Sequence, residues 1–569
     1  MPYYIGLANT CHDPAVAVVS PEGDLVFAQA LERYFQQKRA WDLPPDHGGY
    51  LRDVLRAHCA PREGVVVATC WRTPGLLGKP FDAPPSLSPG NRQGESLLRE
   101  SDGQWLMWSQ KKAYEGCGTH LSYLLSHYFD CDKIEIRSYD HHLTHAANAC
   151  FTSPFNRALC VIADGEGEIG SVSSYLYDQE ALTPLGRSWG PGSLGAYYAK
   201  LTEWCGFDWR KGEEGKVMGL AAYGQHRAQL EKELASLVRY DNGQLLQGRK
   251  RDLAQVLRRL EGGGGFTRED MACTGQQVFE ERMLALLQGV YHRGGSTNLV
   301  LGGGCALNSS FNGKILRKTG FEAVHVPCSP ADDGNAAGAA MLAFMSDRRE
   351  HKAQINHGPW ASPYLGSEMD PKAMTRLTRS FPPGRISHHP GTIHEKAAQR
   401  LSRGQILGWV QGRAEYGPRA LGNRSILADP RNGTLKDRIN REVKFREDFR
   451  PFAPAVLASE THRWFQFGME SPYMSFTLPF QSSKVDDVPA VVHKDGTGRL
   501  QTVHGEANPA FHGLITHFHQ LTGIPLVLNT SMNIMGKPLV HSLEDAVGLF
   551  FTTGLDALVI GDYLIRKEA

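Results

Sequence analysis

The stretch that decides the fold reads YYIGLANTCHDPAVAVV, from Tyr3 to Val19. Two apolar segments, Tyr3–Ala8 and Ala15–Val19, flank its polar turn, and a third apolar segment, Leu25–Ala30, follows. Short β-rich segments separated by Gly, Pro and Asp are typical of hairpins. The chain is therefore predicted to begin with three successive strands.

The same pattern returns further along the chain. Leu159–Ala163 has the composition of a buried strand, DGEG from Asp164 to Gly167 reads as a turn, and Val172–Tyr177 alternates like a second strand. Two copies of strand, phosphate-sized turn and strand predict a duplicated α/β architecture, although the copies share a pattern rather than a sequence.

The remaining segments extend the α/β prediction to the end of the chain. Helices are expected over Gly116–Tyr128, His141–Cys150, most of residues 196–265 and Val278–Tyr291, and strands over Asn298–Leu301, Gln405–Val410 and Pro525–Leu528. The polar, Pro-rich stretch between His351 and Pro371 is the best candidate for a linker.

Composition and charge exclude several classes of protein. The chain has 569 residues, 41% of them hydrophobic and 21% charged, and a formal net charge of +1. A net charge this close to zero argues against a protein whose main activity is electrostatic binding to nucleic acid or to an anionic membrane. No apolar run reaches the roughly 18 residues of a membrane span, and no signal peptide follows Met1. Because the 11 cysteines form no C-x-x-C pair, we expect reduced thiols and a cytoplasmic protein.

A metal site is indicated by the sequence HHLTH, from His141 to His145. These two histidines are four positions apart, so on a helix both imidazoles can reach one cation. An isolated pair of this kind is more often a helix cap and a core histidine. Here, however, Asp164 at a strand end and the adjacent Asp332 and Asp333 add carboxylates. Such a mixed N/O set suits Fe(II), Mn(II) or Zn(II), and the choice between Asp332 and Asp333 stays open.

Nucleotide binding is indicated by glycine-rich loops rather than by a dinucleotide motif. Gly165, Gly167 and Gly170 have G-x-G-x-x-G spacing, but the residues that follow alternate like a strand, so no helix N-terminus is offered to a pyrophosphate. The loops 301–308 and 211–220 each precede a helix, where backbone N–H groups can approach phosphates. Taken singly, each loop is equally well explained by glycines that only form a turn. Together with the Asp-Gly hairpin, the loops predict an actin-like nucleotide cleft.

The C-terminal part has the densest signal. Residues 413–450 contain eight arginines and two lysines against six acidic residues. Arginines held by Gly417, Pro418 and Gly422 suit bidentate recognition of phosphate or carboxylate, whereas a merely solvated basic face would favour lysine. Arg499 and the polar loop Asn529–Asn533, directly after a predicted strand, add further ligand groups.

Together these motifs resemble the NodU/CmcH family of O-carbamoyltransferases, which modify antibiotics of the tobramycin type and other natural products. The resemblance covers nearly the whole chain. The motifs that carry it are HHLTHAA at 141–147, ADGEGE at 163–168, GPRALGNRS at 417–425, RPFAP at 450–454 and LNTSMN at 528–533. Thr144 and Ala163 replace the Ala and Val that are usual in the first two motifs, and the last three motifs are intact.

The resemblance implies a fold and a reaction. An actin-like duplicated domain, similar to threonylcarbamoyl transferases, is expected over residues 1–355, a linker over 356–375, and a YrdC-like α/β domain over 376–569. Carbamoyl phosphate and ATP would form carbamoyl adenylate, from which the carbamoyl group passes to an acceptor hydroxyl. A monomer or homodimer acting on a small molecule is expected, with no nucleic acid or membrane as partner.

The resemblance also assigns site residues. Carbamoyl phosphate is expected on Arg419, Arg450, Arg499, Asn529 and Ser531, the first two of which would be catalytic. A divalent metal, Fe(II) ahead of Mn, Zn or Mg, is expected on His141, His145, Asp164 and Asp332. ATP or the adenylate is expected on Lys38, Asp164, Gly165, Lys216, Gly304 and Asn308.

Histidine 12, in the first predicted turn beside Asp13, is a candidate general base for the acceptor hydroxyl, because a neutral imidazole suits that role near pH 7. An equally good interpretation is that His12 only stabilises the turn.

Three other functions were weighed. A tRNA threonylcarbamoyl transferase shares the N-terminal fold but needs no carbamoyl-phosphate motif. In a non-catalytic metal or nucleotide sensor we would expect residues of the arginine motif to be lost, but the motif is intact. A hydride-transfer enzyme is disfavoured by the strand after Gly170.

The acceptor itself is not named by the sequence. Loops at 36–45 and 72–110, with Trp41, Trp71, Trp105 and Trp108, are candidates to line its pocket.

Overall fold

The computed structural model describes residues 1–59, 64–72, 97, 100–129, 131, 133–189, 191–261, 264–351, 362–382 and 384–567. The chain divides into two compact units. Unit 1 contains Met1–Glu32, Arg39–Asn308 and Lys314–Ala361, and unit 2 contains Arg33–Lys38, Ser309–Gly313 and Ser362–Ala569.

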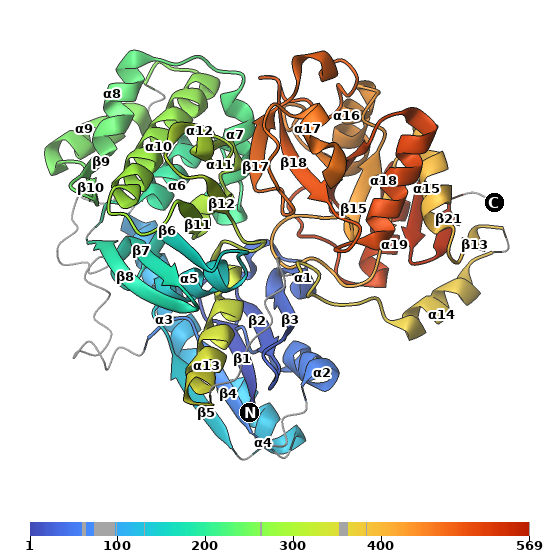
Figure 1. The fold of residues 1–569 in the computed structure, drawn as a ribbon, viewed down its shortest axis with the longest axis horizontal. Coiled ribbons are helices and arrows are strands. Elements are labelled where there is room, and N and C mark those ends of the chain that lie inside the picture. The colour runs from blue at the N-terminus through green and yellow to red at the C-terminus, as the bar shows by residue number, and fades with distance from the viewer. Residues whose placement is uncertain are drawn as a thin grey trace. The chain divides into compact units, whose positions relative to one another are not determined.

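Unit 1 has two five-stranded sheets with the same topology (Figure 1). The first sheet has, in spatial order, β3 (Leu25–Ala30), β2 (Ala15–Val19), β1 (Tyr3–Ala8), β4 (Val65–Thr69) and β5 (Ile134–Ser138). The second has, in the equivalent order, β8 (Ala181–Ser188), β7 (Gly170–Asp178), β6 (Arg157–Gly167), β11 (Asn298–Gly302) and β12 (Ala323–His325). In each sheet the first three strands pair antiparallel and the last three parallel. This shared topology confirms the predicted duplication, and the first three strands have their predicted bounds.

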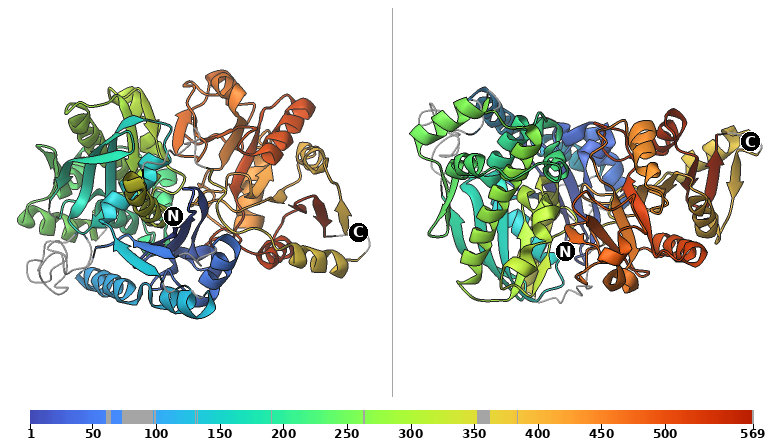
Figure 2. Two further views of the ribbon diagram at one scale, coloured as in Figure 1. Left: turned by 60° about the horizontal axis from the view of Figure 1, so that its bottom comes forward. Right: turned by 90° about the horizontal axis from the view of Figure 1, so that it is seen from above.

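Helices complete unit 1. They are α1 (Leu31–Phe35, whose last three residues belong to unit 2), α2 (Gly48–His58), α3 (Glu100–Gly116), α4 (Thr119–Tyr128), α5 (His141–Phe151), α6 (Leu194–Trp204), α7 (Glu214–Ala221), α8 (Ala228–Leu237), α9 (Lys250–Glu261), α10 (Arg268–Tyr291), α12 (Ile315–Lys318) and α13 (Asn335–His351). Helix α8 packs against both α9 and α10, and all three belong to the green part of the ribbon (Figure 2).

Small residues bring α13 close to both α5 and β1. A Cβ atom added at Gly6 would lie 1.8 Å from the carbonyl oxygen of Ala336, and one added at Gly338 would lie 1.9 Å from that of Thr144. Ala339 and Ala340 are fully buried in the same core. Because glycine and alanine allow this close approach, α13 fixes the position of α5, which bears the predicted metal ligands.

Two secondary-structure predictions for unit 1 are wrong in part. Residues Asp164–Gly167, predicted as a turn, form the end of β6, and the chain reverses at Glu168 and Ile169. Within the segment 196–265, expected to be mainly helical, β9 (Val238–Asp241) and β10 (Gln244–Gln247) form an antiparallel hairpin. Asn242 and Gly243 connect them with φ values of 47° and 81°. An Asn-Gly pair between strands is a strong turn signal, and the charged helices on either side had masked it.

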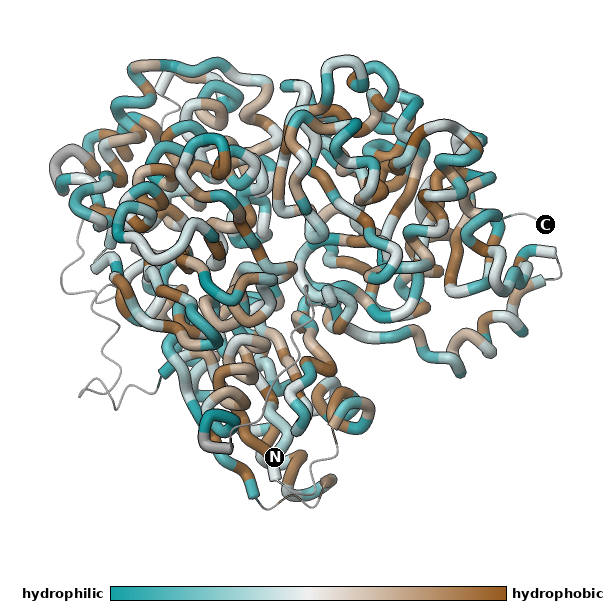
Figure 3. The backbone as a smooth tube through the Cα atoms, in the orientation of Figure 1, coloured by the Kyte–Doolittle hydropathy of each residue, from teal (hydrophilic) through white to brown (hydrophobic). Residues whose placement is uncertain are grey.

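Unit 2 is built on one nine-stranded mixed sheet. Its spatial order is β13 (Ile386–His388), β21 (Tyr563–Arg566), β20 (Ala557–Ile560), β14 (Leu407–Val410), β15 (Arg424–Ala428), β19 (Leu526–Ser531), β16 (Ala453–Leu457), β18 (Thr497–Val503) and β17 (Phe476–Pro479). Its helices are α11 (Ser309–Asn312), α14 (Pro371–Ser380), α15 (Ile393–Ser402), α16 (Thr434–Ile439), α17 (Thr461–Trp464), α18 (Pro509–Thr522) and α19 (Leu543–Thr552). In Figure 3, apolar colour follows the central strands of this sheet.

The region between the units differs from the predicted linker, 356–375. Residues 352–361 lie outside the described part of the chain. Pro371–Ser380 forms α14, whose N-cap Asp370 accepts a hydrogen bond from the backbone N–H of Lys372. Proline in the first turn favours a helix start, so the last part of the predicted linker is helical. The fold is mixed α/β, and the actin-like and YrdC-like assignments stay predictions.

Among the described residues, none of the helices combines the length and apolarity that crossing a membrane requires.

Candidate functional site

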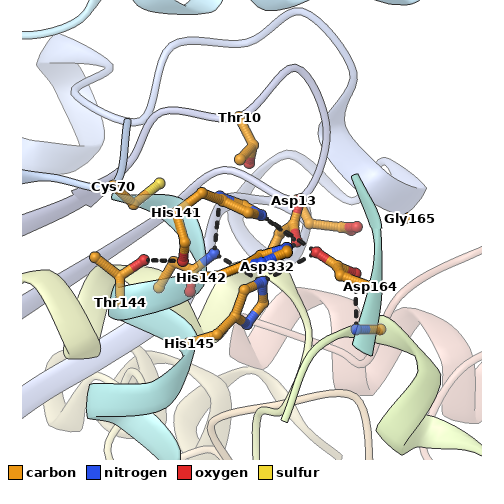
Figure 4. A network of polar contacts seen from close by, with 12 residues as sticks. Thr10, Asp13, Cys70, His141, His142, Thr144, His145, Asp164, Gly165 and Asp332 are labelled. Carbon is orange, nitrogen blue, oxygen red and sulfur yellow. Dashed lines mark hydrogen bonds and ion pairs between the residues drawn. The ribbon is translucent and has the colours of Figure 1, made fainter. Parts of the chain in front are cut away.

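Four side chains from three elements converge in unit 1 (Figure 4). His141 and His145 project from successive turns of α5, Asp164 lies near the end of β6, and Asp332 begins a 3-10 turn directly before α13. Both histidine Nε2 atoms lie 3.2 Å from Asp164 Oδ2, and they lie 3.6 and 3.3 Å from Asp332 Oδ1. The four buried residues each offer one ligand atom, and these atoms lie within 4.8 Å of one another.

Neighbouring groups hold the four side chains in place. The N-cap Asp140 accepts a hydrogen bond from the backbone of Leu143 and so starts α5 just before His141. The Glu168 carboxylate accepts the backbone N–H of His141 at 2.9 Å. Asp164 Oδ1 accepts the backbone N–H of Gly304 at 2.8 Å. The aspartate is thereby tied to the glycine-rich loop after β11.

The electrostatics of this cluster fit a divalent cation. Burial lowers the pKa of His141, but the charge of Asp332 and a hydrogen bond to Asp164 outweigh it and hold that pKa well above its usual value. Burial raises the pKa of Asp164, but the hydrogen bonds with His141 and His145 outweigh it and hold that pKa well below its usual value. The two carboxylates thus favour positive charge at the two imidazoles. A divalent cation held by the same N/O donor set supplies such a charge.

Of the two adjacent aspartates, Asp332 is the one that joins the cluster. The candidate base His12 lies next to it. His12 Nδ1 is 3.0 Å from Asp13 Oδ2 and 3.6 Å from Asp332 Oδ2, and the His12 ring packs edge-on against Trp41. Burial lowers the pKa of His12, but the hydrogen bond to Asp13 and the charge of Asp332 outweigh it, so this pKa is raised.

The residues expected at the nucleotide have different surroundings. Gly304 contacts Asp164, as described above, and a Cβ at Gly195 would lie 2.6 Å from Cα of Gly165, so the start of α6 closely approaches the predicted phosphate turn. Asn308 is held in a reciprocal amide pair with Gln276.

The two lysines expected at the nucleotide differ in position. Lys216, in α7, donates to Glu213 at 2.7 Å. Lys38 belongs to a segment of unit 2, and its role at the nucleotide stays a prediction.

A second cluster, in unit 2, consists of five cations that repel one another. Burial and the charge of Arg450 lower the pKa of Arg419 to about 10, and they lower that of Arg446 to about 9. Burial and the charges of Arg419, Arg446 and Arg450 hold the pKa of Arg499 well below its usual value. Burial and the charges of Arg446 and Arg450 have the same effect on Lys444. A group of buried cations that repel one another in this way has the charge that suits an anionic ligand.

The arginine motif 417–425 has two distinct kinds of arginine. The buried Glu415 carboxylate accepts the backbone N–H groups of Leu421, Asn423 and Arg424, and so shapes the loop. The fully buried Arg424 donates to the carbonyl oxygens of Gln411, Gly412, Ser367 and Asn423. Arg424 therefore holds the loop together, whereas Arg419 belongs to the cationic cluster.

Residues Asn529–Asn533, predicted as a loop, lie beside the cluster, and the first three of them form the end of β19 instead. Ser531 accepts hydrogen bonds from Lys444 at 2.6 Å to its carbonyl oxygen and 3.1 Å to its hydroxyl. Asn529 donates to Ala420 and to Gln501, which connects the strand to the loop that bears Arg419. Lys444 was not predicted from the sequence to be a site residue. The short π-helical turn Asn440–Lys444 turns this lysine, only 2% exposed, into the cluster.

Comparison with known proteins assigns the chain to a family. The family model "Carbamoyltransferase N-terminus" matches residues 97–341, and "Carbamoyltransferase C-terminus" matches residues 398–567.

Three relatives illustrate the similarity. Nodulation protein NolNO of Sinorhizobium fredii is 37% identical over 454 residues, which cover 77% of this chain and 65% of that protein, so the chain spans less than two thirds of NolNO. Uncharacterized protein sll1178 of Synechocystis is 31% identical over 611 residues, which cover 100% of this chain and 97% of that protein. The 3'-hydroxymethylcephem-O-carbamoyltransferase of Amycolatopsis lactamdurans is 34% identical over 265 residues, which cover 46% of this chain and 48% of that enzyme.

The histidine motif lies within the range of the N-terminal family model, and the arginine motif lies within that of the C-terminal one. The chain therefore belongs to the carbamoyltransferase family, enzymes that transfer a carbamoyl group.

Proposed function

We propose that this enzyme is an ATP-dependent O-carbamoyltransferase. Water hydrolyses carbamoyl phosphate to carbamate and phosphate, and a carbamate oxygen then attacks the α-phosphorus of ATP, giving carbamoyl adenylate and pyrophosphate. The acceptor hydroxyl then attacks the carbamoyl carbon, and AMP leaves. The observation that carries the proposal is the cluster of five cations in unit 2.

Carbamoyl phosphate fits the cationic cluster by its charge and by the kind of donors that the cluster offers. Its dianionic phosphate would relieve the mutual repulsion of Arg419, Arg446, Arg450 and Arg499, which lowers the pKa values of three of these arginines. Planar guanidinium groups bind phosphate oxygens in pairs, and Lys444 adds a point charge next to Ser531. We assign Arg419, Arg450, Arg499, Asn529 and Ser531 to this substrate and add Lys444 and Arg446.

In unit 1, we assign the nucleotide to the region around the histidine and aspartate cluster, in an actin-like fold. His141, His145, Asp164 and Asp332 would hold a divalent metal, for which we propose Fe(II) ahead of Mn(II), Zn(II) or Mg(II). When bound, such a metal supplies Lewis-acid stabilisation of phosphate charge. Gly165 and Gly304 are proposed to lie at the phosphates, with Gly304 holding Asp164 there through its backbone N–H, and Lys216, Asn308 and Lys38 are proposed to contact the rest of the nucleotide.

His12 is proposed to position and deprotonate the acceptor hydroxyl. Its Nδ1 faces Asp13 at 3.0 Å, which leaves Nε2 as the nitrogen that takes the proton. Trp41 packs against the ring, at a centroid distance of 4.9 Å, and restricts its rotation. As the acceptor, we propose a small natural product with a free hydroxyl. For the enzyme, we propose two domains, one actin-like and one YrdC-like.

Donor choice separates this proposal from a tRNA threonylcarbamoyl transferase. The full chain is incubated with ATP and either labelled carbamoyl phosphate or labelled threonine with bicarbonate, each with and without tRNA. ATP consumption that depends on carbamoyl phosphate and ignores tRNA supports the proposal. Incorporation of label from threonine into tRNA would instead establish the alternative.

A further inference from the structure

A second group of side chains that could bind a metal lies in unit 2. None of its residues belongs to the cationic cluster. His394 and Glu395 are neighbours in the first turn of α15, and His517 lies on α18. Each offers one ligand atom, and these atoms lie within 4.8 Å of one another. All three residues are half-buried, so solvent ions can reach them.

The His517 ring is oriented as a metal ligand requires. Its Nδ1 lies 2.9 Å from the carbonyl oxygen of Gly513, one turn earlier in α18. A ring nitrogen facing a carbonyl carries the proton, so Nε2 keeps its lone pair. That Nε2 points to Glu395, whose Oε1 is 3.5 Å away. Ligating histidines in proteins almost always have a hydrogen bond of this kind at the second nitrogen.

The His394 ring reaches the same point from the other helix. Its centroid is 4.7 Å from that of His517, at an interplanar angle of 61°. The ring lies beside Gly513, where a Cβ atom would be in ordinary contact with it, at 3.4 Å. Gly513 thus lies next to both histidines, and its carbonyl oxygen accepts a hydrogen bond from His517.

The two helices form a rigid support. In the core of unit 2, Ile393, Ala397 and Leu401 of α15 pack with Leu514 and Phe518 of α18, and all five are at least 95% buried. The three ligand side chains therefore start from fixed backbone positions, which lowers the entropy cost of binding an ion.

We propose that His394, Glu395 and His517 bind a borderline divalent d-block cation of the Zn(II) type. Two imidazole nitrogens and one carboxylate oxygen suit Zn(II), Cu(II) or Ni(II), and disfavour Mg(II) and Ca(II), which prefer oxygen ligands. Three protein ligands leave a coordination position for water or another small ligand. The ion joins α15 to α18 and stabilises unit 2. This site shares no residue with the proposed catalytic metal cluster.

Zn(II) binding to the full-length chain tests the proposal. Equilibrium dialysis with elemental analysis is compared between wild type, His394→Ala, Glu395→Gln and His517→Ala, with His519→Ala as the matched control on the same helix. Each of the three site variants is expected to lose one Zn(II) equivalent, or to bind it at least about tenfold more weakly, and the control is expected to bind as wild type does. Two of the changes are on α15 and one on α18, so misfolding of one variant leaves the others informative.

Thermal unfolding gives an independent readout. Zn(II) is expected to raise the unfolding midpoint of wild type and of His519→Ala more than that of the site variants. Carbamoyl phosphate-dependent ATP turnover is expected to be unchanged in all four variants, since none of these residues belongs to the proposed catalytic machinery. The proposal is overturned if the site variants bind as much Zn(II), with the same affinity, as wild type. The contact between His517 and Glu395 would then be an ordinary ion pair.

Discussion

Replacing Arg419 by methionine is expected to stabilise the enzyme while removing its activity. Burial beside Arg450 lowers the pKa of Arg419 to about 10. For a base with a lowered pKa in the folded state, the charged form is penalised at every pH below about 10, and the penalty disappears as pH rises from that value to the ordinary pKa of arginine. At 1.36 kcal/mol per pKa unit the penalty is about 3 kcal/mol. Partial exposure of Arg419 reduces it, so we expect a gain of about 1–3 kcal/mol at neutral pH.

The same change removes a charged donor from the proposed phosphate site. A charge-assisted hydrogen bond contributes about 1.5–3 kcal/mol, so kcat/KM for carbamoyl phosphate should fall about 10- to 150-fold. Where like charges repel one another in a binding site, removing one of them is expected to give a more stable but less active variant.

Arg424→Met is the matched control, because it removes an arginine of the same motif. Arg424 satisfies four backbone carbonyl oxygens, so its loss should destabilise the enzyme. Both variants are measured by urea unfolding in the absence of substrate and by ATP turnover at varied carbamoyl phosphate. If Arg419→Met destabilises as Arg424→Met does, or if it leaves kcat/KM unchanged, the assignment of these cations to anion binding is refuted.

The other predictions concern unit 1. Asp332→Asn should lower affinity for the catalytic divalent metal at least tenfold, whereas Asp333→Asn should change it little; equal losses in metal titrations would contradict the choice of Asp332. His12→Ala should slow carbamoyl transfer about 100-fold and leave acceptor-free AMP formation intact, and loss of both in a product assay would refute its role as base. Gly167→Ala should destabilise by about 1–3 kcal/mol, because its Cβ would lie 2.8 Å from Nε2 of the buried His142; unchanged unfolding would show that this contact relaxes freely.

The sheet architecture of unit 1 could be predicted because its signals are local. Apolar runs bounded by Pro, Gly and Asp set the bounds of β1, β2 and β3, and the repeat of this pattern around Asp164 predicted the second sheet. The hairpin at Asn242-Gly243 was missed although its turn residues are plainly present, since charged helical segments surround it. The helical pattern of the flanking segments was the stronger signal and hid the turn signal of Asn242 and Gly243.

The candidate site was predictable only where its residues are close in sequence or lie in a recognisable motif. The spacing of His141 and His145 predicted that they share a helix face, and the structure brings them together with Asp164. The choice of Asp332 over Asp333 depends on how the 3-10 turn orients each side chain, which no spacing gives.

Lys444 shows a further limit of sequence reasoning. It stands among arginines and glutamates in a segment that has the composition of a solvated surface. Only the π-helical turn and the contact with Ser531 reveal that it is buried beside other cations.

The most direct test of the proposed reaction is the formation of carbamoyl adenylate without an acceptor. The full chain is incubated with ATP, carbamoyl phosphate and Fe(II), and AMP, pyrophosphate and the adenylate are followed by mass spectrometry. We predict that pyrophosphate and carbamoyl adenylate form only when carbamoyl phosphate is present. If ATP is left untouched, or is consumed at the same rate without carbamoyl phosphate, the account of the cationic cluster as the donor site is contradicted.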